Sequence, residues 1–242
     1  MTTLASRLLD AWERGYERSS IERALLLLAV AEPGEPFDRL AQVSIGERDA
    51  RLLTLREHAF GRRMGSRVAC PSCATELEFE FTTDDVRVSD ATSPGDAVVH
   101  YNGYQVRVRP ANSADLASLA AGEDVTANVH RLFGCCVLAA SRDGVTVAAD
   151  ALPLHVTQHV SERLSEIDPQ AEVRIAADCP SCAHRWQAPL DIASYVWAEI
   201  HAWACRLLRD IHSIASTYGW REAEIIALSP IRRQLYLDLI QS

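Results

Sequence analysis

The chain has 242 residues, enough for one large domain or two small ones, and its 48% hydrophobic and 24% charged residues are typical of a soluble folded protein. Its net charge of −9 repels nucleic-acid phosphates over most of the surface, so nucleic acid is not an expected partner. The longest purely apolar run, residues 24–31, is too short to cross a bilayer, and the first ten residues lack the pattern of a secretory signal. We therefore expect a cytoplasmic protein without membrane contact.

Residues 1 to about 62 predict a small helical unit. Apolar side chains recur there at helical spacing and share one face: Leu4, Leu8, Trp12 and Tyr16. Two capping-box patterns and two stop signals mark the ends of further helices: Ser19 with Glu22, Ser44 with Glu47, Pro33-Gly34 and Gly61.

The middle of the chain mixes strands and helices. Residues 76–81 alternate polar and apolar side chains, which predicts a half-buried strand, and Asn102-Gly103 inside the alternating segment 98–108 suits a tight hairpin. Further patterns predict a short helix from Asn112 or Ser113, a turn at Arg142-Asp143-Gly144, helices over 124–140 and 153–167, and a strand over 171–176. Cys135 and Cys136 are expected to pack inside the helix over 124–140.

The last fifty residues predict a helical arm. Apolar residues recur every three or four positions from Asp191 to Tyr218, and Gly219 then breaks the helix. A short helix over 221–228 follows, and Ser229-Pro230 supplies the start of a last helix that ends near Ile240.

The strongest chemical pattern is the repeated sequence Cys-Pro-Ser-Cys-Ala at 70–74 and 179–183. Two thiolates two residues apart can bind one metal ion, so Cys70, Cys73, Cys179 and Cys182 together predict a tetrahedral four-cysteine site. The 105 residues between Cys73 and Cys179 far exceed an ordinary ribbon loop, which indicates a zinc ribbon split by an inserted domain. Such a site leaves no open coordination position, so we expect one structural Zn²⁺; iron also accepts tetrahedral sulfur.

Three other interpretations of these cysteines stay open. A thioredoxin-like redox pair would need its motif at the start of a helix in a βαβ context. Two separate sites, with His184 as an additional ligand of the second, form another possibility, and the absence of a metal forms the third. On the zinc interpretation, serine in place of Cys70 or Cys179 is expected to unfold or aggregate the protein.

No protease, nucleophile-elbow, phosphate-loop or dinucleotide motif is present, so we expect no enzyme. His155 and His159 are spaced for metal binding on a helix but have no third ligand in the sequence. Cys205 lies in an apolar helical pattern, and Glu222 with Glu224 suit the first turn of a helix. Candidate partner contacts are the aromatic and basic residues of the arm: Trp197, Trp203, Tyr218, Trp220, Arg232, Arg233 and Tyr236.

Several segments resemble a known family. After the second cysteine motif these are 185–189, 191–193, 197–200, 218–225 and 229–237, and earlier ones are 44–50 and 168–171. The chain is similar to the baseplate hub assembly chaperone family of contractile-tailed phages and phage-tail-like contractile injection systems. The resemblance implies a non-enzymatic assembly factor or accessory component in the cytoplasm, with hub or spike proteins as partners.

The expected fold is α+β and mostly helical, with a split zinc-ribbon-like four-cysteine site flanking a small inserted α+β domain. The expected divisions are a helical unit (1–65), a first knuckle (66–84), the inserted domain (85–175), a second knuckle (176–190) and the C-terminal helices (191–242). Two alternative functions remain: a zinc-ribbon regulator that binds nucleic acid or polymerase, and a thiol oxidoreductase that uses Cys179 and Cys182.

Overall fold

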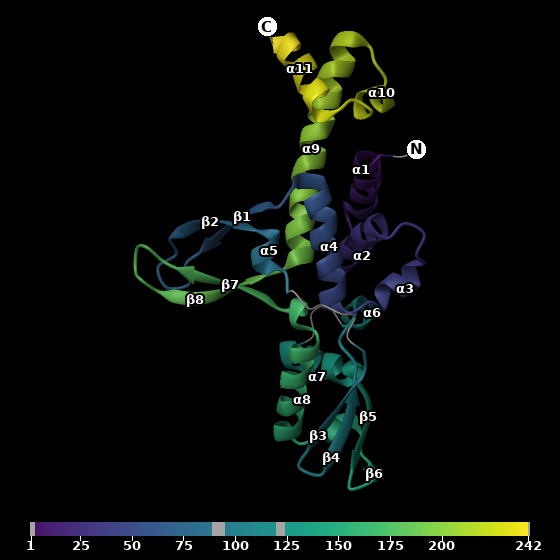
Figure 1. The fold of residues 1–242 in the computed structure, drawn as a ribbon, viewed down its shortest axis with the longest axis vertical. Helices are drawn as coiled ribbons and strands as arrows, with labels where there is room; N and C mark the ends of the chain where they lie inside the picture. Colours follow the sequence, from purple (N-terminus) through teal and green to yellow (C-terminus); the bar gives the residue numbers. More distant parts are fainter. Residues whose placement is uncertain (1–2, 89–94, 120–123, 242) are drawn as a thin grey trace.

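In the computed structural model, residues 3–88, 95–119 and 124–241 are described; residues 89–94 and 120–123 of the expected inserted domain lie outside these ranges, as do 1, 2 and 242. The chain forms an elongated molecule with a helical body at its centre (Figure 1). The end of the long helix α9 lies at one end of the molecule and a small sheet with two helices at the other, while two hairpins project sideways. Within the described ranges, no helix combines the length and apolarity needed to cross a membrane.

The body packs the N-terminal helices against α9. Its elements are α1 (Leu4–Gly15), α2 (Ser20–Ala31), α3 (Phe37–Ala41), α4 (Ile45–Phe60) and most of α9 (Ile192–Tyr218). Their facing sides form one core that includes the fully buried side chains Leu27, Leu28, Leu52, Leu53 and Ile200. The predicted capping box of Ser19 and Glu22 is confirmed, and Ser44 caps α4 by accepting the N–H of Glu47.

Two features of this region differ from the prediction. The short helix α3 was not expected, because its five residues are too few to show a periodic pattern. The strand that begins at Arg63, after Gly61 ends α4 with a φ of 86°, was not expected either. That strand is held by pairing with a later segment rather than by a pattern of its own.

Two antiparallel hairpins carry the cysteine motifs. The first pairs β1 (Arg63–Ala69) with β2 (Glu76–Thr82), and the second pairs β7 (Val173–Asp178) with β8 (Arg185–Leu190). The strand predicted over 171–176 starts two residues later, because a 3₁₀ turn, η2 (Pro169–Ala171), precedes it.

Between the hairpins lies the insertion. Its elements are α5 (Thr83–Val86), β3 (Ala97–Tyr101), β4 (Tyr104–Val108), α6 (Ser113–Ala117), α7 (Val125–Cys136), β5 (Val137–Arg142), β6 (Val145–Thr146), the 3₁₀ turn η1 (Ala149–Ala151) and α8 (Leu154–Ile167). The sheet order is β3-β4-β5-β6, and α8 covers it over a separate small core that contains Val106, Val108, Val156 and Val160. Positive φ angles at Asn102 and Gly103 confirm the predicted hairpin turn.

The helix predicted over 124–140 is wrong at its C-terminal end. α7 stops at Cys136, and residues 137–142 form β5, whose pairing with β4 runs from Val137 opposite Val108 to Arg142 opposite Tyr104. The apolar run at this point fits either a helix or a buried strand, and the adjacent strand decides between them. Cys136 is buried as expected, whereas Cys135 is half-buried.

The C-terminal helices follow the prediction. α9 ends at Gly219, which adopts the left-handed conformation with a φ of 69°, and α10 (Glu222–Ile226) and α11 (Pro230–Gln241) fold back on it. The fold class is confirmed as α+β and mostly helical. The five divisions of the chain stay a prediction.

Candidate metal centre

The two cysteine motifs adopt the same turn at the tips of the two hairpins. In the first, the backbone N–H of Cys70 donates to the carbonyl of Thr75 and the N–H of Ala74 donates to that of Cys70, both at 2.9 Å. Cys179 repeats this arrangement with His184 and Ala183, again at 2.9 Å. Each turn therefore directs both of its sulfurs to one side, as chelation of one ion requires.

The four sulfurs come together between the hairpins. Cys70 Sγ lies 3.7 Å from Cys182 Sγ, and Cys73 Sγ lies 3.6 Å from Cys179 Sγ. All four lie within 4.8 Å of one another, and all four are free thiols. A tetrahedral ion with metal–sulfur bonds of about 2.3 Å needs sulfurs about 3.8 Å apart, whereas a disulfide needs about 2.05 Å. The spacing thus fits a four-thiolate metal site and not a disulfide.

The surroundings favour the thiolate form at one ligand. The hydroxyl and then the backbone N–H of Thr75 hydrogen-bond to Cys73 Sγ and lower the pKa of Cys73 to about 6. At Cys182 the hydrogen bond from the backbone N–H of His184 lowers the pKa. Desolvation and the neighbouring thiols have the opposite effect and together raise the pKa of Cys182 to about 11. Four adjacent thiolates repel one another, and a divalent cation would remove that repulsion.

The geometry bears on the other interpretations of the cysteines. Within the described residues this is the only group of three or more possible ligands close enough to share an ion, and His184 stacks on Trp186 at 5.7 Å instead of joining it. Each motif lies between two strands and not at the start of a helix, where a thioredoxin-like pair would lie. One shared site is therefore better supported than two separate sites or a redox pair.

Side chains of the body hold the base of the first hairpin. The Tyr195 hydroxyl donates to the carbonyl of Gly65 at 2.9 Å and accepts its N–H at 3.1 Å, which fixes β1 on α9. The buried guanidinium of Arg56 donates to both carboxylate oxygens of Glu199 at 2.7 and 2.9 Å and to the carbonyls of Gly61 and Arg63. The hydrogen bonds that Arg56 donates to Glu199 raise the pKa of Arg56, so this guanidinium remains charged.

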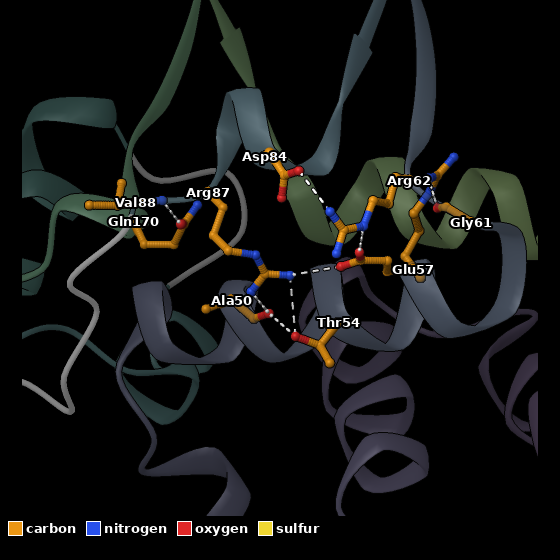
Figure 2. Close-up of polar contacts among 10 residues, drawn as sticks. Ala50, Thr54, Glu57, Gly61, Arg62, Asp84, Arg87, Val88 and Gln170 are labelled. Carbon is orange, nitrogen blue, oxygen red and sulfur yellow. Dashed lines mark hydrogen bonds and ion pairs between the residues drawn. The ribbon is translucent and has the colours of Figure 1, made fainter.

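A surface network fixes α5 on α4 (Figure 2). The Arg87 guanidinium donates to Thr54 Oγ1 at 3.3 Å and reaches Glu57 Oε2 at 3.5 Å. Arg62 forms ion pairs with the same Glu57 and with Asp84. Its Nη1 lies 3.0 Å from Asp84 Oδ2. Partly exposed pairs of this kind contribute at most about 1 kcal/mol each, so they orient the first hairpin more than they stabilise it.

Both ends of the insertion meet at the start of α4. The carboxylate of Asp168 accepts the N–H of Gly46 at 3.0 Å and the hydroxyl of Ser44 at 3.3 Å, so it caps α4 from 122 residues away. A Cβ at Gly46 would lie 2.1 Å from the Asp168 carboxylate and 2.9 Å from the N of Ala171, so only glycine fits. Burial raises the pKa of Asp168, although the two hydrogen bonds favour its charged form.

Two more buried polar groups complete this junction. The amide of Gln170 donates to the carbonyl of Val86 at 3.0 Å and accepts the N–H of Val88 at 2.7 Å (Figure 2 shows the Val88 contact), which ties the chain before β7 to the chain after α5. Arg48 forms a buried ion pair with Asp49 at 2.8 Å, and burial raises the pKa of Asp49 to about 6. The junction thus aligns the two hairpins that carry the cysteines.

The structure places the seven predicted partner residues in different settings. Trp197 is a core residue, because its ring fills the space beside Gly15 and lies under the Arg23 guanidinium at 4.8 Å. Trp197 is only 9% exposed and presents little surface to a partner, contrary to the expectation for this residue. Trp203 is half-buried with its ring 6.4 Å from that of Phe60.

The other five residues lie at the end of the arm. The rings of Tyr218, Trp220 and Tyr236 form one cluster with centroids 4.9 to 5.7 Å apart, so they pack mainly against one another. Arg233 lies 3.6 Å from Asp210 of α9, whereas Arg232 is exposed. The cluster fastens α11 to α9.

The other candidate groups lie apart from the cysteine cluster in the described structure. His155 and His159 contact the ring of Tyr101, with centroids 6.0 and 4.3 Å away, and join no ligand cluster among the described residues. Sequence reasoning missed His201, whose Nε2 lies 3.8 Å from Cys205 Sγ.

The tautomer of His201 decides whether this ring can accept a proton from Cys205. Its Nδ1 accepts the indole N–H of Trp12 at 3.0 Å, and because an indole only donates, the neutral ring carries its proton on Nε2, facing the sulfur of Cys205. The ring in this state cannot take a proton from Cys205 as a general base. The i, i+4 spacing of the two residues could have indicated the contact, but Trp12 is 189 residues away.

Residues 34–194, more than half of the chain, match the family described as T4 bacteriophage base plate protein. The chain belongs to this family. The matched region contains all four cysteines, both hairpins and the insertion, and it ends three residues into α9, so the arm lies outside it. No curated protein and no solved structure matches the chain. The expected resemblance is thereby confirmed at the level of a phage baseplate protein.

Proposed function

We propose that this baseplate-family protein is a non-enzymatic assembly factor for the baseplate hub of a contractile tail or injection system, stabilised by one structural Zn²⁺. The family match supports the baseplate part of the proposal, and it spans the whole insertion and its junction with the body. Hub or spike proteins are the partners that such a role requires. A chaperone of this kind acts in the producing cell and leaves before the particle is complete.

The zinc assignment rests on the donor set and its spacing. Four thiolate donors select zinc or iron among the common metals, and four protein ligands leave no position for water or substrate. The ion would be held by Cys70, Cys73, Cys179 and Cys182, two from each hairpin. Its role is to join the hairpins that flank the insertion and so to fix the insertion on the body.

Deletion of the gene in a producing strain, followed by complementation, tests the proposal. Without the protein we expect few complete tails by electron microscopy, with free hub subunits in the lysate. Wild type and the matched control Cys205→Ser should restore tails, while the double variant Cys70→Ser, Cys179→Ser should restore far fewer. Normal tail numbers in the deletion strain would contradict the assembly role, and full rescue by the double variant would contradict the need for metal.

A further inference from the structure

α11 has two apolar faces, and only one of them packs inside the molecule. Tyr236, Leu237 and Ile240 face α9, with Leu237 only 9% exposed. Ile231, Leu235 and Leu239 follow one another at intervals of four residues on the opposite face, where they are 75%, 57% and 64% exposed. We call these three residues the outer stripe. A surface helix normally has one apolar face, so a second one indicates a second contact.

The size of the outer stripe indicates a small occupant. Its three side chains expose on the order of 350 Å² of apolar surface, the range of functional patches on monomers. A stable dimer buries about 800 Å² from each partner, more than twice this area. The stripe is therefore too small for a second copy of the chain and fits a single amphipathic helix, whose apolar residues at positions i, i+4 and i+7 would lie along it.

One charged side chain at the edge of the stripe is available to a partner. Arg232 lies along one edge of the stripe, and within the described part of the chain no carboxylate pairs with it. On the other edge, Asp238 accepts a hydrogen bond from Gln234 at 2.9 Å. An acidic side chain of the occupant would pair with Arg232.

We propose that the outer stripe of α11 docks a short acidic amphipathic helix of a baseplate partner. This inference rests on the proposed function, because it supplies the surface that holds the client. The docking surface is therefore the outer stripe and not the aromatic cluster of Tyr218, Trp220 and Tyr236, because those rings already pack against one another.

Fluorescence anisotropy with labelled 20-residue peptides that tile the hub and spike proteins of the same particle tests the proposal on the full-length protein. We expect the bound peptides to be acidic and to carry apolar residues at helical spacing. Leu235→Ser should weaken their binding at least about tenfold, as loss of a central interface side chain does, and Arg232→Glu should weaken it most at low salt. The matched control is Leu154→Ser, an exposed leucine of α8 that is 71% exposed.

Three results would overturn the inference. One is unchanged peptide binding in Leu235→Ser, and another is the absence of any bound peptide although intact hub protein binds the chain. The third is concentration-dependent dimerisation, measured by analytical ultracentrifugation, that Leu235→Ser abolishes, because a second copy would then cover the stripe. Failure of intact hub and spike proteins to bind the wild-type chain would instead contradict the proposed function.

Discussion

Replacing Cys179 by serine removes one of the four sulfurs and should reduce bound zinc from one ion per chain to a small fraction of that. The proposed metal would link two hairpins whose inner cysteines are separated by 105 residues. A cross-link across a loop of roughly 100 residues removes about 4–5 kcal/mol of conformational entropy from the unfolded chain. For a chain of this length, 1 kcal/mol shifts the unfolding midpoint by about 2–4 °C, so the variant should unfold about 8–20 °C lower.

The loss should be concentrated at the hairpin tips. Among the described residues, the buried members of the small apolar cluster at the site are Leu77, Cys70 and Cys179, with Val68, Phe79 and Trp186 half-buried beside them. A two-stranded hairpin is marginal without further support, whereas the base of the first hairpin keeps the contacts of Arg56 and Tyr195. Hydrogen exchange should therefore accelerate most over 66–79 and 176–188 and to a smaller extent in α2 and α4. Zinc content, thermal unfolding and exchange measured beside Cys205→Ser check this; unchanged zinc and unchanged protection in Cys179→Ser would refute the reasoning.

Three further predictions concern the junction. Gly46→Ala should lower the free energy of unfolding, measured by urea denaturation, by more than about 2 kcal/mol, because the added Cβ has no space. The control Gly134→Ala should raise it by about 0.5–1 kcal/mol, because no atom lies within 4 Å of the added Cβ and alanine favours a helix over glycine. Gln170→Ala should cost about 2–3 kcal/mol and expose the Val88 amide to exchange; a protected amide would contradict this. Burial raises the pKa of Asp49 to about 6, so between pH 4 and 6 the unfolded chain releases this proton more readily than the folded chain. The free energy of unfolding of the wild type should therefore fall by up to about 3 kcal/mol relative to that of Asp49→Asn as the pH rises from 4 to 6. A difference between the two proteins that does not change with pH would disprove this assignment.

The sequence predicts best what is decided within a few residues. The capping box of Ser19 and Glu22, the hairpin turn at Asn102-Gly103 and the stop at Gly219 each depend on side chains or φ preferences at the site itself. The four cysteines are predictable for a similar reason, since the two-residue spacing already fixes how each pair can bind an ion.

What the sequence could not predict depends on distant segments. β1 and β5 became strands because β2 and β4 pair with them, and the apolar residues of β5 alone also fit the end of a helix. Asp168 caps a helix 122 residues earlier, and Arg56 pairs with Glu199 across 143 residues. No local pattern encodes such contacts.

The expectation that serine at Cys179 unfolds the whole chain also changes with the structure. The core of the body is separate from the small cluster at the cysteines, so the body can stay folded when the tips lose their order. A stability effect of the metal is therefore distinguishable from a general collapse of the protein.

The most direct test of the central claim is the quantity of this chain in two fractions from the same producing cells, measured by mass spectrometry. In the lysate, tagged protein washed at moderate salt should retain hub or spike proteins. Purified finished particles should contain much less than one copy of the chain per hub subunit. Retention of polymerase subunits or nucleic acid in place of hub proteins would contradict the assembly role, and a fixed stoichiometry in finished particles would make the protein a structural component and not a chaperone.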